Sequence, residues 1–275
     1  MCVRTHNNIF LDHGEKQVPF EFVRLLCYLQ CMQTPSVYHN LWDRLFRNKW
    51  LLGLFLIFLF GIPRVILVMN ASVTGQTQWV SIIFTLMFFT PLLFLKKAGR
   101  REMGLRKSSQ PLWLLWGFLL GCGMCLLLFF INRLIFGLEI SNPFVYIASS
   151  TTSGDTSMVY FLIYLAIMMT FSPIGEELFY RGVVHQAFRD QLGDKRASYI
   201  DSAAFALTHM AHFGIIYAAG VWKFLPLPTL LWISAMFFTC MVFNRVRQES
   251  GSILGAILTH AGFNFAMGFL MFYAL

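Results

Sequence analysis

The sequence has few charged residues and no polar segment long enough to form a soluble domain. Only 12% of its 275 residues are Asp, Glu, Lys or Arg, while 57% are apolar and 30 are phenylalanine. A soluble domain has roughly 25% charged and 45–50% apolar residues. The composition therefore excludes a soluble globular enzyme and predicts an integral membrane protein with several spans.

Several common functional patterns are also missing. The six cysteines form no metal or disulfide framework, and the Cys122-x-x-Cys125 pair lies in an apolar segment, which favours packing over redox chemistry. No H-E-x-x-H zinc motif occurs, and no cleavable signal peptide is evident. The second half does not repeat the first, as it does in many transporters.

Apolar runs of about 20 residues predict transmembrane helices. Seven are predicted, at about 50–69, 79–95, 111–131, 158–188, 198–222, 229–243 and 252–273. The fold class is thus an all-α, polytopic membrane helix bundle of seven to eight transmembrane helices with an intramembrane catalytic cavity. Residues 45–275 form this domain, with a motif-bearing core at 158–269. Residues 1–44 are an N-terminal extension, either a helix on the membrane surface or a disordered tail.

The net charge of +8 reflects topology, because the basic residues cluster beside apolar runs rather than along one soluble face. We therefore expect no nucleic-acid partner. Basic clusters before the first predicted span and after the second, fourth and sixth alternate with loops that hold few cations. Positive loops face the cytoplasm, so we predict a cytoplasmic N-terminus. His185 lies close to this side and is expected to be solvated.

Glu176, Glu177 and Arg181 follow the uncharged run 159–174. An ionisable group at membrane depth costs ~2.5–3.5 kcal/mol even on lenient scales, so adjacent acids there indicate a functional site. Glu177 and Arg181 are four residues apart and can pair on one helix face. A purely structural ion pair is the alternative. Glu176 points about 100° away and is free to face a cavity.

Other polar residues are predicted at a similar depth. With a rise of ~1.5 Å per residue, Glu176, His209 and His260 lie roughly 12–18 Å from the cytoplasmic side on three different spans. Asn264 shares a helix face with His260, and Phe205 lies one turn from His209. His209 and His212 could also form a metal-binding pair, although ligands on one helix more often stand four residues apart.

These groups suit two kinds of hydrolysis. A carboxylate and a histidine can activate water, while His260 and Asn264 donate hydrogen bonds to a developing oxyanion. Alternatively, Glu176, His209 and His260 match the ligand set of a catalytic divalent metal such as zinc. The residues alone leave both readings open.

The residues also resemble a known family. Three motifs carry the resemblance, namely Glu176-Glu177-x-x-x-Arg181, Phe205-x-x-x-His209 and His260-x-x-x-Asn264. Their order and spacing are similar to those of the CPBP family of intramembrane proteases, also called the CAAX-protease, bacteriocin-processing or Abi family. The Gly104-Leu105-Arg106 stretch is similar to the cytoplasmic loop of this family.

The resemblance implies roles for these residues. Glu176 is the general base and His209 assists it, while His260 and Asn264 stabilise the oxyanion. With these roles the metal-free reading, which requires no cofactor, is favoured over a divalent metal such as zinc. Glu177 and Arg181 form an orienting pair, and Phe205 is structural. The implied activity is intramembrane endopeptidase cleavage of a hydrophobic, lipidated or precursor peptide.

Two other classes of function stay open. A non-catalytic immunity or scaffold protein could use the same polar cluster to hold a partner helix. A proton-coupled carrier would also place Glu and His inside the membrane. We expect a multi-pass protein of a bacterial plasma membrane, with membrane lipids around it.

Overall fold

The structure is a computed structural model that describes residues 36–151 and 157–275. Residues 37–275 form one compact unit. Most of the predicted N-terminal extension, including its possible surface helix, lies outside the described residues. The helices before the acid pair are α2 (Asn40–Leu45), α3 (Lys49–Thr74), α4 (Gln78–Phe94), α5 (Lys97–Glu102), α6 (Leu112–Phe136), α7 (Pro143–Thr151) and α8 (Met158–Glu177).

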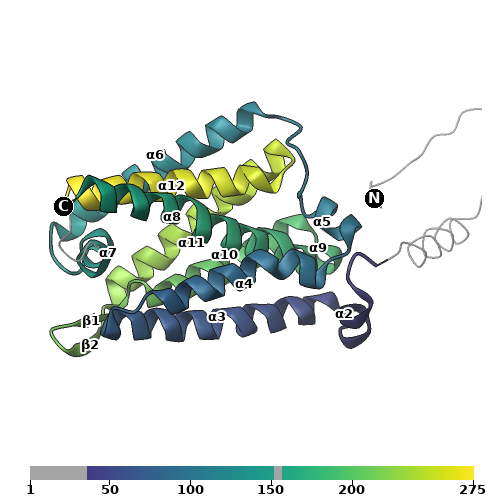
Figure 1. The fold of residues 1–275 in the computed structure, drawn as a ribbon, viewed down its shortest axis with the longest axis horizontal. Coiled ribbons are helices and arrows are strands. Elements are labelled where there is room, and N and C mark those ends of the chain that lie inside the picture. The colour runs from purple at the N-terminus through teal and green to yellow at the C-terminus, as the bar shows by residue number, and fades with distance from the viewer. Residues whose placement is uncertain (1–35, 152–156) are drawn as a thin grey trace, which may run out of the picture. The chain divides into compact units, whose positions relative to one another are not determined.

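The second half begins as a continuation of α8. The remaining elements are the π-helical segment η1 (Leu178–Val184), α9 (His185–Leu192), α10 (Asp194–Thr208), the 3-10 turn η2 (His209–Ala211), strands β1 (Ile215–Ala218) and β2 (Val221–Phe224), α11 (Pro226–Ser250) and α12 (Ile253–Tyr273). Helices α2, α5 and α9 gather at one end of this unit, and α7, β1 and β2 lie at the other (Figure 1).

The prediction of an all-α membrane bundle is confirmed. Five helical stretches are long and apolar enough to cross a membrane: 49–74, 112–136, 158–192, 226–250 and 253–273. Helix α4 is apolar but shorter. Large apolar side chains such as Phe58, Leu134 and Val159 are exposed, as expected of a surface that faces lipid. Six of the seven predicted spans begin within three residues of the predicted start.

The predicted span at 198–222 is wrong as a single helix. Helix α10 ends at Thr208, and the chain continues through η2 into an antiparallel hairpin in which Ala218 pairs with Val221. Ala219 and Gly220 both have positive φ, as the two central residues of a type I′ hairpin turn require. Gly214 also has a positive φ of 124°, so the helical path cannot continue through it.

Helices α6 and α12 lie unusually close because each presents a glycine to the backbone of the other. A Cβ atom on Gly121 would overlap the carbonyl oxygen of Thr259, and one on Gly262 would overlap that of Phe118. Small residues allow such backbone contact between membrane helices. This contact fixes α12, which carries His260 and Asn264.

Helix α8 passes directly into η1 and α9, so residues 158–192 form one long helical rod. Ser157 caps its start by accepting a hydrogen bond from the backbone N–H of Tyr160. The π-helical turns begin immediately after Glu177. Such segments occur often at functional sites, and here the change in helical pitch lies beside the acid pair.

Candidate functional site

The two adjacent acids lie at the end of α8 and are fully enclosed. Glu176 and Glu177 are 1% and 0% exposed. The Ser172 hydroxyl, one turn earlier, donates a 2.8 Å hydrogen bond to Glu176 Oε2. A buried carboxylate needs such partners, because burial without them is costly.

Glu177 joins two other helical elements through one oxygen. Its Oε1 accepts from Arg181 Nη1 at 3.2 Å, which confirms the predicted pair, and from His260 Nδ1 at 2.9 Å. Arg181 also lies 3.7 Å from Asp201 Oδ1 on α10, and its guanidinium lies over the rings of Phe205 and Phe243. Glu177 therefore fixes the position of His260 as well as that of Arg181.

His260 lies between the two carboxylates. Because Nδ1 donates to Glu177, the other nitrogen faces Glu176, with Nε2 3.7 Å from Oε2. Phe243 stacks on the imidazole ring. A hydrogen bond from Nε2 to an oxyanion requires a proton on both nitrogens, since Nδ1 already carries one.

His209 is the first residue after α10, so the end of that helix positions it. Its Nδ1 lies 2.8 Å from the carbonyl oxygen of Phe205, which can only accept, so Nδ1 carries the proton. The Phe205 ring stacks on the imidazole at 4.2 Å. The lone pair of Nε2 is thereby directed into the site.

Asn264 is one turn beyond His260 on α12 but makes a different contact. Its Nδ2 donates a 2.8 Å hydrogen bond to the carbonyl oxygen of Met168 on α8. The amide thus ties α12 to the helix that carries the acids. The second N–H of the same nitrogen is the one that could donate to a substrate oxygen.

Arg64 on α3 is a member of the site that the sequence reasoning missed. It is 1% exposed, and its Nη1 forms an ion pair with Glu176 Oε1. Its Nη2 lies 3.5 Å from His209 Nε2 and 3.4 Å from His212 Nε2. The predicted first span ended at 69, which put Arg64 near a membrane edge. Because α3 continues to Thr74, Arg64 instead lies in the helix interior.

His185 was expected to be solvated, and this is wrong. It is 1% exposed and lies 2.7 Å from Asp201 Oδ2 through Nδ1 and 2.9 Å from Asp194 Oδ1 through Nε2. Arg247 Nη2 is 2.9 Å from the same Nε2. Through Asp201, these residues extend the polar contacts of Arg181 toward the end of the bundle that holds α9. These hydrogen bonds reduce the cost of burying the polar groups.

The alternative zinc site does not fit this arrangement. The candidate ligands Glu176 and His209 are directed at the guanidinium of Arg64, whose positive charge would oppose a metal ion bound between them. Within residues 36–151 and 157–275, no three His, Cys, Asp or Glu side chains are placed to bind a metal ion.

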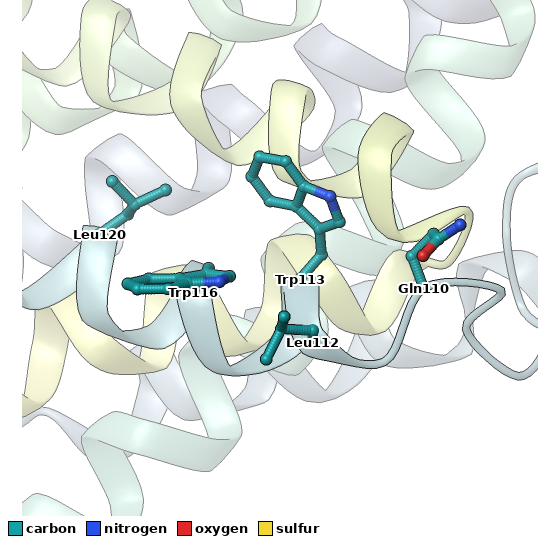
Figure 2. A pocket seen from close by; sticks show the side chains of 5 residues that line it. All are labelled: Gln110, Leu112, Trp113, Trp116 and Leu120. Atoms are coloured by element: carbon teal, nitrogen blue, oxygen red, sulfur yellow. The ribbon is translucent and has the colours of Figure 1, made fainter.

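A surface hollow on α6 lies apart from these residues. Figure 2 shows its lining side chains, which come from α6 and the turn before it: Gln110, Leu112, Trp113, Trp116 and Leu120. Neither glutamate of the acid pair and none of the site histidines is among these lining residues. Leu112 and Trp116 are exposed apolar residues, so we assign this hollow to the surface that faces lipid.

Comparison with known proteins gives one family match, over part of the chain. Residues 158–266, from the start of α8 into α12, match the model of a family of membrane endopeptidases. The family is the one described as type II CAAX prenyl endopeptidase Rce1-like, and the chain carries an Rce1-like domain over these residues. No curated protein and no solved structure matches the chain.

The match confirms the resemblance drawn from the three motifs. The matched segment contains both glutamates, Arg181, Phe205, His209, His260 and Asn264. It does not contain Arg64, which lies more than 90 residues before its start. Residue 64 thus enters the site from a part of the chain that the family model does not describe.

Proposed function

We propose that this protein is an intramembrane endopeptidase that hydrolyses one peptide bond of a hydrophobic, lipidated or precursor peptide with water activated by Glu176 and His209. The observation that supports it best is the contact of His260 with both carboxylates. This contact brings the motifs of α8 and α12 together. His209, which follows α10, joins them because Arg64 contacts both His209 and Glu176.

The proposed reaction needs only these side chains and water. Glu176 takes a proton from water while the water oxygen attacks the carbonyl carbon of the scissile bond. Hydrogen bonds from His260 and Asn264 stabilise the resulting oxyanion. Glu176 then gives the proton to the leaving nitrogen as the carbon–nitrogen bond breaks. The attacking water replaces the 3.5 Å contact of Arg64 Nη2 with His209 Nε2, and the Nε2 lone pair accepts a hydrogen bond from this water and orients it.

The family description points to a prenylated peptide as the first substrate to test. A lipid chain would hold such a substrate at the membrane, and three residues beyond the modified cysteine would form the leaving peptide. We also propose that the bundle end with α2, α5 and α9 faces the cytoplasm, because basic residues such as Lys97, Arg100 and Arg101 lie there (Figure 1). A bacterial plasma membrane stays our expectation for its location.

The test uses purified full-length protein in lipid nanodiscs and an internally quenched peptide with a farnesylated cysteine followed by three residues. We expect wild-type cleavage after the cysteine, and loss of cleavage in Glu176→Gln and His209→Ala. Glu249→Gln is the matched control, because Glu249 pairs with Arg245 away from the site. Wild-type rates in both site variants would contradict the catalytic proposal and favour a scaffold role.

A further inference from the structure

Arg64 is an unusual residue for the interior of an apolar helix. It stands 15 residues after Lys49, about 22 Å along the axis of α3, and is 1% exposed. Charged residues at such depth are rare and mark functional sites by default. A purely structural charge would need only one counter-ion, but the guanidinium of Arg64 contacts three groups.

The three groups are one carboxylate and two imidazoles. Nη1 pairs with Glu176, and Nη2 faces His209 Nε2 at 3.5 Å and His212 Nε2 at 3.4 Å. The rings of Phe84 and Phe205 lie within cation–π distance of the same guanidinium, at 5.3 and 5.9 Å. In these contacts the guanidinium meets one carboxylate, two histidine nitrogens and two ring faces, and all of these groups favour a positive charge.

A carboxylate and two histidine nitrogens are also the ligands that a catalytic zinc ion takes. His209 can offer only Nε2 to a cation, because its Nδ1 donates to Phe205. That Nε2 is already directed at Arg64. A divalent ion bound to these atoms would lie next to the guanidinium of Arg64. Two neighbouring cations repel strongly in a site that holds little water.

We propose that Arg64 is the built-in cation of this site: it takes the position that a divalent metal would need and holds Glu176 beside His209. Arg64 acts through Glu176, so it is a positioning residue. The effect that we expect on kcat rests on the proposed function. The effect that we expect on zinc binding does not depend on it.

Zinc binding provides the first test. Purified wild-type protein and Arg64→Met are stripped with a chelator, exposed to zinc alone, desalted and analysed for metal content. Methionine keeps the length and apolar stem of arginine but removes the charge. We expect no stoichiometric zinc in the wild type, about one zinc per chain in Arg64→Met, and none in Arg64→Met combined with His212→Ala.

Two results would overturn the proposal. One is stoichiometric zinc in the wild type that disappears in His209→Ala, because the metal would then share the site with Arg64. The other is absence of zinc from a folded Arg64→Met. If Arg64→Met fails to fold, the zinc content of the wild type, compared with that of His209→Ala, still tests whether zinc shares the site with Arg64. Arg133→Met is the control, since Arg133 is exposed near the end of α6.

Kinetics provide the second test if the wild type cleaves the farnesylated peptide. Misplacing Glu176 should lower kcat in Arg64→Met on the order of 10²-fold while KM stays near the wild-type value. Arg64→Lys, which keeps a cation, should recover part of kcat. Equal kcat in Arg64→Met and wild type would overturn the positioning role. Failure of the wild type to cleave would count against the proposed function and leave the zinc result standing.

Discussion

The Nδ1 atom of His260 on α12 lies 2.9 Å from the Oε1 atom of Glu177 on α8, across 83 residues of sequence. The same oxygen accepts a hydrogen bond from Arg181, and as an acceptor it orients His260 with the proton on Nδ1. A carboxylate that fixes the tautomer and orientation of a histidine is a recurrent device in catalytic sites. Glu177 therefore serves the candidate site as well as the stability of its helix.

This relationship predicts the effect of Glu177→Gln. The amide keeps the size of the side chain but removes the charge. Its NH₂ group, unlike a carboxylate oxygen, cannot accept the hydrogen bond from Nδ1. We expect kcat for the farnesylated peptide to fall on the order of 10²–10³-fold, the loss typical of one oxyanion donor. Glu249→Gln should keep the wild-type kcat. A purely structural Glu177 would instead reduce thermal stability and leave kcat of the folded fraction unchanged.

Local sequence patterns were sufficient for most of the membrane helices. Apolar runs and capping residues such as Ser157 mark where helices begin, and the rod from Met158 onward was predicted as one element. The pattern failed at 198–222, where apolar residues such as Ile215, Ile216 and Val221 belong to strands. Apolar composition is common to buried helices and short strands, and only Gly214 and Gly220 signalled the change.

The site was predictable where its members belong to one helix and less so where they meet across helices. The Glu177–Arg181 pair follows from a four-residue spacing. Arg64 could have been found from its charge within α3, but the helix end was placed five residues too early. The Asn264 contact with Met168 depends on the glycine-mediated approach of α6 and α12 and on the packing of α12 against α8, which no local pattern specifies.

The contact between α6 and α12 predicts a difference between two glycines on the same helix. A methyl group on Gly121 would meet the backbone of Thr259, whereas nothing lies within 4 Å of one on Gly123. Overpacking typically costs ~1–3 kcal/mol, so Gly121→Ala should lower the unfolding temperature in detergent and Gly123→Ala should not. Equal unfolding temperatures would mean that the two backbones are not in contact.

The contact of Asp194 with His185 predicts a pH-dependent contribution to stability. The hydrogen bond from His185, with help from Arg247, lowers the pKa of Asp194 to about 2. An unfolded Asp has a pKa near 3.9. The carboxylate therefore stabilises the fold above about pH 4, and this contribution is lost as the pH falls through about 2.

Thermal unfolding of Asp194→Asn in detergent would measure this contribution. The variant should unfold at a lower temperature than the wild type at pH 5, and the difference should shrink steadily toward pH 2. Glu139→Gln, an exposed change in the turn after α6, controls for loss of a carboxylate elsewhere. A difference that stays constant between pH 5 and pH 2 would show that Asp194 does not depend on His185 in this way.

His209 and His212 offer the sharpest separation of roles, because their rings are only 5.3 Å apart and both face Arg64. The geometry of His209, with Nδ1 held by Phe205 and Nε2 directed into the site, suits proton transfer, and its loss should lower kcat by on the order of 10²–10⁴.

His212 contributes one long hydrogen bond to Arg64. Such a bond contributes ~0.5–1.5 kcal/mol, so His212→Ala should lower kcat by no more than about tenfold. Steady-state cleavage of the farnesylated peptide by both alanine variants, with His39→Ala as a control outside the site, measures this ratio. A larger loss in His212→Ala than in His209→Ala would transfer the proposed catalytic role from His209 to His212.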